Sequence, residues 1–256
     1  MAHSSAKHHT IAALILLGVV AAVCVSLGNW QLRRAAQRDT IKQAIDNGRS
    51  HPPLQLNART PQKELINWRP AVVSGTWLDG FTVLLENRNF KGMPGFWVAT
   101  PLLIEPGTAV LVLRGWVARP LSPGDMLPSI SAPKNSVSVK GELLNRVPRL
   151  FELWSFSKQT EGQLPAKLPT ANLVAPKVQN LNLADYAKAS GLTLLPSILE
   201  QTSDDHDQLG REWPQPSIDA DTNRGYALQW FSFAAVAAIA GLAIAWRALS
   251  RRKKPL

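Results

Sequence analysis

Cysteine is nearly absent from this 256-residue chain, and common catalytic patterns are missing. With Cys24 as the single cysteine, an intramolecular disulfide and a cage of cysteine metal ligands are excluded. The sequence has no phosphate-binding glycine loop, no Gly-x-Ser-x-Gly and no His-x-x-x-His. A nucleophile and its base cannot be assembled from adjacent residues, although distant residues could still meet in the fold. We therefore expect no enzymatic activity and no metal site.

Few histidines are available for a site in the middle of the chain, since three of the five lie in the N-terminal tail. The other two are His51, before a Pro-Pro pair, and His206, inside the acidic run Asp204–Asp207. Carboxylates of this run could bind a hard cation, but the spaced ligands and the glycine turn of a calcium loop are missing. We expect a solvated acidic turn, with cation binding as the alternative.

Two long apolar stretches are present, and they lie near the two ends of the chain. Ile11–Leu27 and Tyr226–Trp246 contain no charged residue over 17 and 21 positions. A helix needs about 17 to 25 apolar residues to cross a bilayer. The sequence predicts transmembrane helices at residues 11–29 and 225–247, with a cleaved secretory signal as the alternative for the first.

Basic residues next to the spans predict the orientation. A cytoplasmic tail at residues 248–256 is indicated because five basic residues and no acid follow the uncharged stretch that ends at Trp246: Arg247, Arg251, Arg252, Lys253 and Lys254. Two spans place residues 1–10 on the same side. We expect a bacterial inner-membrane protein with both termini cytoplasmic and a large periplasmic domain. Six of the ten net positive charges then belong to the terminal segments, which favours membrane lipid and not nucleic acid as a partner.

The long middle segment reads as short strands broken by glycine and proline. We expect a β-rich domain at residues 30–200, followed by a polar tether at residues 201–224. The predicted strands are Pro70–Trp77, Phe81–Arg88, Gly95–Glu105, Ala109–Ala118, Ser136–Leu144 and Leu194–Glu200, with one helix at Asn182–Ser190. Asp79-Gly80 predicts a hairpin between the first two, and Pro101 an edge or bend. The fold class is two transmembrane α-helices flanking a mainly antiparallel β (α+β) domain.

Aromatic and basic side chains are the main candidates for a working surface. Trp30 and Trp230 flank the spans, where amphipathic rings settle at headgroup depth, and Arg33 has a stem that can snorkel. Arg114, beside Trp116 on the most strand-like segment, either pairs with a domain carboxylate or anchors a partner loop or a haem propionate.

Small residues recur every four positions in both spans. They form the ridges Gly18/Ala22/Ser26 and Ala237/Gly241/Ala245. Such ridges allow close helix contact in lipid. We expect the two ridges to pack on each other, with helices of a partner protein as the alternative.

Four short segments, in order along nearly the whole chain, resemble the Surfeit-locus protein 1 family. They are Gly28–Arg33, Thr100–Leu102, Arg114–Val117 and Gly225–Phe231, placed between and beside two spans as in that family. The resemblance implies an inner-membrane assembly factor for haem-copper cytochrome c oxidase, which assists formation of the haem a site in subunit I. Its partners would be subunit I or assembly intermediates of the oxidase.

The resemblance also implies where haem a would bind. Some members are described as binding haem a through a histidine three positions before the equivalent of Tyr226. Here that position is Asn223, a poor iron ligand, which leaves Tyr226 as a weak candidate. The candidate partner-binding residues are Trp30, Arg33, Arg114, Trp116, Tyr226 and Trp230. A membrane-tethered periplasmic enzyme and a structural envelope protein are the alternative functions.

Overall fold

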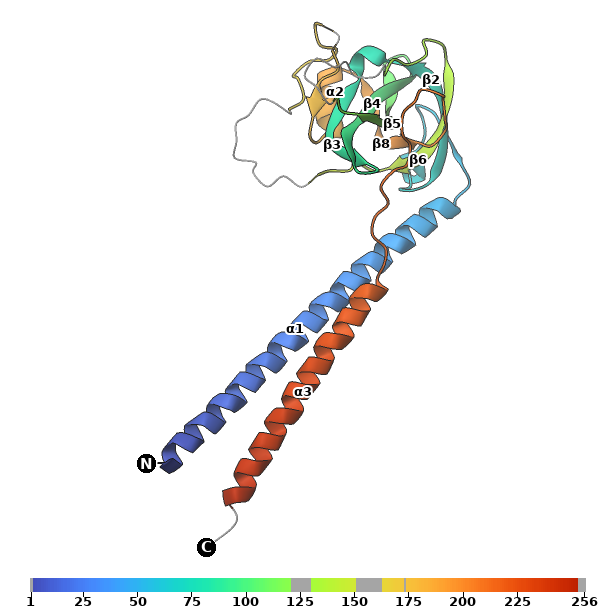
Figure 1. Cartoon of the computed structure of the whole chain (residues 1–256). Coiled ribbons are helices and arrows are strands. Elements are labelled where there is room, and N and C mark those ends of the chain that lie inside the picture. Colours follow the sequence, from blue (N-terminus) through green and yellow to red (C-terminus); the bar gives the residue numbers. More distant parts are fainter. Residues whose placement is uncertain (1, 121–129, 151–162, 173, 253–256) are drawn as a thin grey trace. The chain divides into compact units, whose positions relative to one another are not determined.

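The computed structural model describes residues 2–120, 130–150, 163–172 and 174–252, with the backbone alone for residues 2–7, 251 and 252. The chain divides into two compact units. One consists of Met1–Gln43 and Pro216–Leu256 and is helical, and the other, Ala44–Gln215, contains the sheet. The predicted combination of two long apolar helices and a sheet-rich domain between them is confirmed (Figure 1).

Helix α1 (Ala2–Ser50) is much longer than the predicted first span. Its 49 residues correspond to about 73 Å, more than twice the thickness of a bilayer core. Residues 30–47 contain no glycine or proline and are rich in good helix formers, so the helix does not end at residue 29. The sheet unit therefore begins at Ala44 and not at residue 30.

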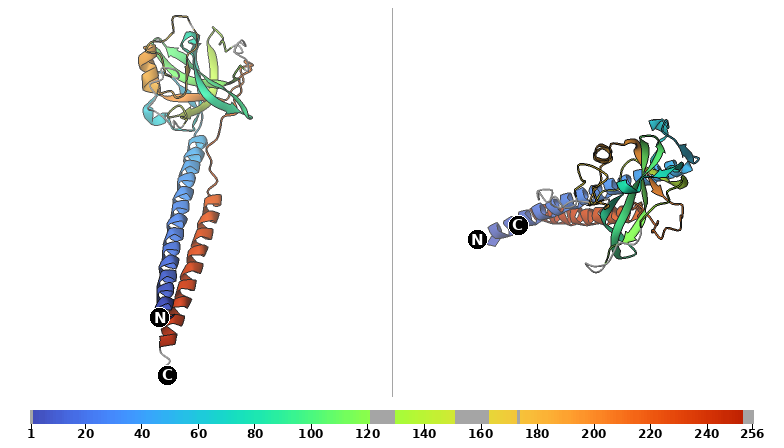
Figure 2. Two further views of the ribbon diagram at one scale, coloured as in Figure 1. Left: turned by 60° about the vertical axis from the view of Figure 1, so that its left-hand side comes forward. Right: turned by 90° about the horizontal axis from the view of Figure 1, so that it is seen from above.

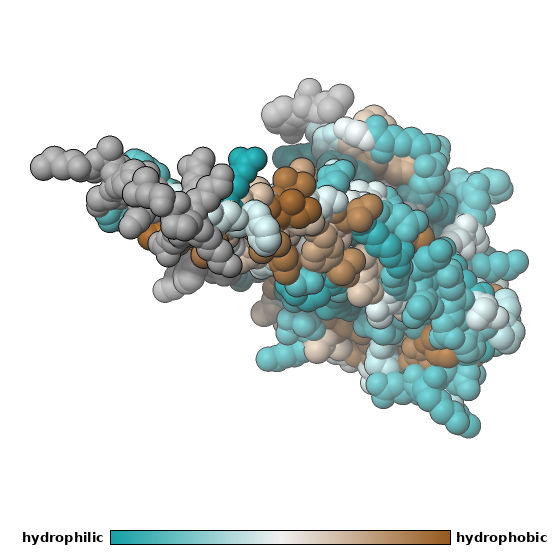
Figure 3. Space-filling model, turned by 90° about the horizontal axis from the view of Figure 1, so that it is seen from below, coloured by the Kyte–Doolittle hydropathy of each residue, from teal (hydrophilic) through white to brown (hydrophobic). Residues whose placement is uncertain are grey.

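Helix α3 (Asp221–Arg252) runs antiparallel to α1 within the helical unit, and the two lie side by side in both views (Figures 1 and 2). Both helices contain a stretch long and apolar enough to cross a membrane. Small residues fill the seam between them: Cys24, Gly28, Ala35, Ala227, Ala234 and Ala237. On the face shown in Figure 3, apolar side chains gather over the helical part, while the domain is mostly hydrophilic.

The two ridges expected to pack on each other do not both lie in this seam. Ala237 is buried and Gly241 approaches Leu17, but Gly18, Ala22 and Ser26 are exposed. The buried positions of α1 recur every 3.5 residues on average, whereas a strict four-residue spacing drifts off that face. The first ridge thus points away from α3.

Within the part of the chain that the structure describes, the sheet has eight strands, which are β1 (Leu54–Leu56), β2 (Pro70–Trp77), β3 (Val83–Phe90), β4 (Met93–Glu105), β5 (Thr108–Ala118), β6 (Val137–Leu144), β7 (Lys177–Val178) and β8 (Thr193–Gln201). Their order is β1-β2-β6-β8-β5-β4-β3-β7. A further pairing of β2 with β4 closes β2, β6, β8, β5 and β4 into a barrel. Five of the pairings are antiparallel, as predicted, and β1–β2, β3–β7 and β5–β8 are parallel.

The predicted hairpin at Asp79-Gly80 is wrong. Asp79–Phe81 forms a 3-10 turn, and β2 pairs with β4 and β6 instead of with β3. The bend predicted at Pro101 fits the structure, because the same edge of β4 pairs with β3 up to Ala99 and with β2 from Leu102. Proline lacks the N–H that a continuous ladder would need at this change of partner.

Strand β5 is buried on both faces, which explains its unbroken apolar sequence. Leu111 and Leu113 face one apolar cluster, and Val110 and Val112 face another. Helix α2 (Leu183–Ser190) covers the first cluster with Tyr186, whose hydroxyl donates to the Phe81 carbonyl at 2.5 Å. Asn182 caps the start of α2, and Gly191 (φ 69°) ends it in the left-handed conformation.

The segment expected as a tether at residues 201–224 folds largely onto the domain. Gln201 ends β8, residues up to Gln215 belong to the sheet unit, and α3 starts at Asp221. Leu209 is buried, and Trp213 packs edge-on against Trp97 with ring centroids 5.3 Å apart. The polar composition concealed this packing because the acidic residues pair with arginines of the domain.

Candidate functional site

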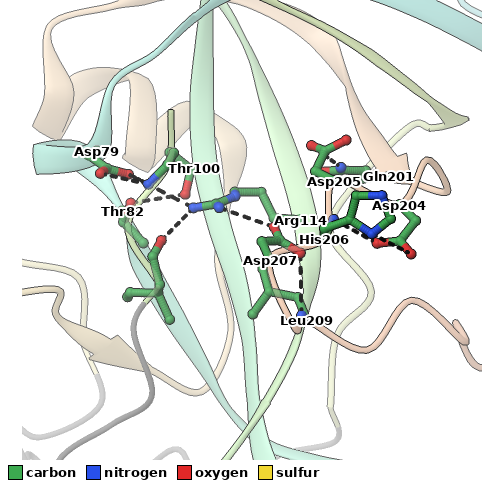
Figure 4. Close-up of polar contacts among 12 residues, drawn as sticks. Asp79, Thr82, Thr100, Arg114, Gln201, Asp204, Asp205, His206, Asp207 and Leu209 are labelled. Carbon is green, nitrogen blue, oxygen red and sulfur yellow. Dashed lines mark hydrogen bonds and ion pairs between the residues drawn. The ribbon is translucent and has the colours of Figure 1, made fainter. Parts of the chain in front are cut away.

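Arg114 is the centre of a buried polar network in the barrel (Figure 4). Its side chain is 1% exposed, on β5 at a bulge between the pairs formed by Leu113 and Gly115. Nη2 donates to Asp207 Oδ2 at 3.3 Å, Nη1 donates to the Ile130 carbonyl at 2.6 Å, and Asp79 Oδ1 lies 3.9 Å from Nη1. Burial lowers the pKa of Arg114, and the two carboxylates oppose that shift. The expected pairing with a domain carboxylate is therefore present.

The network holds the loop at residues 204–213 against the barrel. Asp207 also accepts from Arg211 at 2.6 Å, and Trp116 exchanges backbone hydrogen bonds of 2.7 and 2.9 Å with Gly210. A Cβ at Gly115 (φ 156°) would lie 2.6 Å from the Leu209 Cβ, so the close approach needs a glycine there. The Arg-Gly-Trp sequence on β5 thus supplies an ion pair, a backbone contact and a ring at one place.

Trp116 is buried and belongs to the core, so it is not an exposed contact. Its Nε1 donates to the Arg88 carbonyl at 2.7 Å, and its ring lies 5.0 Å from that of Phe90. Arg88, 4% exposed, donates to the carbonyls of Pro148 and Gln179 and stacks 4.5 Å above the Trp97 ring. Burial lowers the pKa of Arg88 to about 10.

The acidic run around His206 is a turn braced by ion pairs. Asp205 accepts from Gln201 at 2.7 Å, and Asp204 lies 3.7 Å from the imidazole of His206, whose side chain is 92% exposed. Among the described residues no group of three histidine, cysteine or acidic side chains could hold a metal ion. His51 Nδ1 donates to the Asn47 carbonyl at 2.7 Å, so both histidines take part in local turn contacts.

The other four candidate residues lie on the helices. Trp30, Arg33 and Tyr226 are exposed, with Trp30 48% and Tyr226 49% exposed, and Trp230 is half-buried against Phe233 at 6.0 Å. The six candidates therefore divide between the two units: Arg114 and Trp116 in the domain, and these four on α1 and α3. The structure brings no more than the two domain residues into one network.

Asn223 does not fit a haem ligand. It is 8% exposed in the seam, and its Nδ2 donates to Gln31 Oε1 at 2.5 Å across the helix pair. One turn further into the span, a Cβ on Gly28 would already lie 2.6 Å from the Phe231 ring, so the seam has no space for a porphyrin. Carboxamides are also poor ligands for haem iron compared with imidazole, thiolate or phenolate.

Sequence reasoning missed the partners that complete these sites. Asp79, Asp207 and Gln31 contact Arg114 and Asn223 from positions far away along the chain, and no local pattern marks them. Arg88 carried one available signal: a lone arginine on a strand that begins with apolar residues and is followed by a turn. That signal alone does not show which carbonyls it meets.

Comparison with known proteins identifies a family for the chain. A family model described as the SURF1 family matches residues 18–235. Uncharacterised SURF1-like proteins of Mycobacterium tuberculosis (strain ATCC 25618 / H37Rv) and Mycobacterium bovis are each 26% identical over 231 residues, covering 89% of this chain and 79% of theirs. A SURF1-like protein of Dictyostelium discoideum is 26% identical over 105 residues, 38% of this chain and 39% of its own. The family match covers most of the chain, and the protein belongs to the SURF1 family.

Proposed function

We propose that this protein is a non-catalytic assembly factor for haem-copper cytochrome c oxidase, which assists formation of the haem a site in subunit I. The observation that carries the proposal is the family match over residues 18–235, because the SURF1 family is known for cytochrome oxidase assembly. Subunit I or an assembly intermediate containing it is the proposed partner. Since Asn223 does not fit iron, the protein acts on the partner's haem site without holding haem a through that residue.

The helices support a role in binding another membrane protein. Exposed large apolar side chains line both, among them Ile15, Val19, Val23, Phe233 and Leu242. The outward ridge of Gly18, Ala22 and Ser26 offers a smooth surface of the kind that membrane helices pack against. These features suit contact with lipid and with the transmembrane helices of an oxidase subunit.

The domain supports a scaffold in preference to an enzyme. The ion pairs of Asp207 with Arg114 and Arg211 hold a loop to the barrel. Two open grooves of about 450 and 540 Å³ beside α2 share Arg149, Leu181 and Asn182, and no histidine or cysteine lines their described walls. Both grooves present mixed polar and apolar surfaces that suit binding.

The proposed location is the bacterial inner membrane, with both termini cytoplasmic and the sheet domain periplasmic. Two candidate spans support a two-pass protein. The five basic residues that follow the second span support a cytoplasmic C-terminus.

Deleting the gene in its host tests the function. We expect the oxidase to lose haem a and activity while transcripts of its subunits stay at wild-type levels, because assembly and not expression is affected. The reduced haem a band in membrane spectra and oxygen consumption measure the result, and expression of the intact gene from a plasmid should restore both. Wild-type haem a content in the deletion strain, grown with ample copper and iron, would contradict the proposal.

A further inference from the structure

The seam between α1 and α3 has the periodicity of a coiled coil. Buried or half-buried positions include a series with alternating spacings of three and four: 17, 21, 24, 28, 31, 35 and 38 on α1, and 220, just before α3, followed by 223, 227, 230, 234, 237 and 241 on α3. A mean spacing of 3.5 residues keeps one face of each helix turned toward the other over many turns. The two helices therefore pack as an antiparallel pair along a defined seam.

The apolar part of the seam selects the register mainly at one place. Ala227, Ala234 and Ala237 are small, alike and buried in the seam, whereas Gly28 lies against Phe231, so that a Cβ at position 28 would come within 2.6 Å of the ring. If α3 slid by one turn, about 5 Å, the alanines would exchange places with little change, but Phe231 would leave Gly28. The alanines thus leave neighbouring registers similar in energy, and the Gly28–Phe231 contact and the polar contacts must distinguish them.

A polar pair lies within this seam. Asn223, 8% exposed, donates from Nδ2 to Gln31 Oε1 at 2.5 Å, and both residues occupy positions of the heptad pattern. Among the described residues, the buried Oδ1 of Asn223 has no hydrogen-bond partner. A buried amide that leaves one oxygen unpaired adds less stability than an apolar residue there, whereas a slip of one turn would unpair both amides. We infer that Gln31 and Asn223 form a polar rung that fixes the register of α1 against α3.

Charged contacts near the rung are more exposed and less selective. Arg224 bonds Asp39 at 2.5 Å across the pair but also Asp221 on its own helix at 2.7 Å, and its side chain is 51% exposed. Arg38 donates to the carbonyl of Asp219. Exposed ion pairs of long side chains contribute little and can re-form after a shift. Among the polar contacts, the rung is therefore the main determinant of the register, and these ion pairs are secondary.

Cysteine cross-linking measures the register directly. A Cβ on Gly241 would lie 4.0 Å from the Leu17 Cβ, within the range of about 3.5–4.5 Å that a disulfide needs. In a Cys24→Ala background, Leu17→Cys with Gly241→Cys reports the observed register, and Leu17→Cys with Ala237→Cys reports a slip of about one turn. The full-length protein is oxidised in membranes, and cross-linked and free chains are separated on non-reducing gels after proteolysis between the helices.

With the rung intact, we expect the first pair to cross-link about tenfold faster than the second. Gln31→Ala with Asn223→Ala should bring the ratio to within about twofold, while the exchange Gln31→Asn with Asn223→Gln, which restores an amide pair, should recover most of the preference. Asp39→Asn with Arg224→Gln is the matched control and should leave the ratio unchanged. Tryptophan fluorescence of each variant verifies that the domain is folded.

Two results would overturn the inference. An unchanged ratio in the double-alanine variant would mean that chain connectivity or packing fixes the register. Loss of the preference in the charge variant, with retention in the alanine variant, would assign the register to the ion pairs.

Discussion

Burying an arginine destabilises a protein unless carboxylates and carbonyls replace the water that solvates its charge, and Arg114 has such partners. The guanidinium nitrogens of Arg114 donate to Asp207 at 3.3 Å and to the Ile130 carbonyl at 2.6 Å. The guanidinium carbon lies 5.1 Å from the centroid of the Trp77 ring. Asp79, 44% exposed, is farther away and also accepts from the Ala132 amide. Asp207 is therefore the more important partner.

Replacing these two carboxylates should have unequal effects. Asp207→Asn removes the nearer charge from a buried cation, so the free energy of unfolding should fall by about 3 kcal/mol. Asp79→Asn removes a solvated charge at 3.9 Å and should cost about 1 kcal/mol or less. Urea unfolding of the detergent-solubilised protein, followed by tryptophan fluorescence, measures both. Equal losses in the two variants would show that Arg114 does not depend mainly on Asp207.

At this scale the sequence predicted the kind of partner but not its identity. For Arg114, next to a glycine and a tryptophan on a strand, the sequence left a domain carboxylate and a partner group as alternatives, and the structure supplies a carboxylate 93 positions away. Trp30 and Tyr226 are exposed on their helices, whereas Trp116 is core, because burial depends on which strands flank β5. Long-range pairing decides both questions, and local sequence does not encode it.

Two acidic residues face each other across neighbouring strands at the end of the domain where the last turn of α1 lies. Glu142 on β6 and Glu200 on β8 are directly opposite in the antiparallel register. Arg49, in that last turn, binds Glu142 through two bonds of 2.9 and 3.0 Å and donates to Gln215 at 2.8 Å. Glu200 is 4% exposed, and its burial, with repulsion from Glu142, raises its pKa to about 7 against the attraction of Arg49.

The raised pKa predicts that the domain loses stability as the pH rises. Because the folded state holds the proton of Glu200 more tightly than the unfolded chain does, stability is highest below the ordinary pKa of 4.5 and falls until the pH passes about 7. The loss should be at most about 3 kcal/mol. Unfolding midpoints of the full-length protein between pH 4.5 and 8 measure it.

Glu200→Gln should remove most of this slope and stabilise the domain at pH 8. Glu105→Gln, at an exposed position on β4, is the control and should keep the wild-type slope. A wild-type slope in Glu200→Gln as well would assign the pH dependence to other groups.

The strands themselves were largely predictable, but their connections were not. Pro70–Trp77 coincides with β2, and the other predicted strands agree with the structure to within about three residues. Apolar runs bounded by glycine and proline carry that information locally. Barrel closure through β2 and β4 depends on two residue pairs, Thr76–Leu103 and Trp77–Leu102, and the Asp79-Gly80 pattern pointed to a different connection. Pairing of β2 with β4 and β6, and not the local Asp79-Gly80 pattern, therefore decides that this segment forms a turn instead of a hairpin.

At the scale of the whole molecule, the proposed insertion of the chain rests on the two apolar helices and on the basic residues between positions 247 and 254. The two candidate spans have opposite chain directions, so the sheet domain is exported only if both termini stay in the cytoplasm. Arg33, Arg34 and Arg38 on the domain side of α1 oppose that orientation, but the basic group after α3 is larger and a long domain translocates largely regardless of its charge.

Fusions to alkaline phosphatase, which is active only after export, test this orientation in a bacterial host. A fusion after Asp219, in the segment between the domain and α3, should be active, and a fusion after Lys254 should be inactive. Replacing the four basic residues at positions 251–254 by asparagine should lower the activity of the first fusion, because the remaining basic residues then favour the opposite orientation. The same replacements leave the apolar length of α3 intact, so a loss of activity reports orientation and not failure to insert. Activity after Lys254 combined with inactivity after Asp219 in the unmodified chain would reverse the proposed topology and place the domain on the cytoplasmic side.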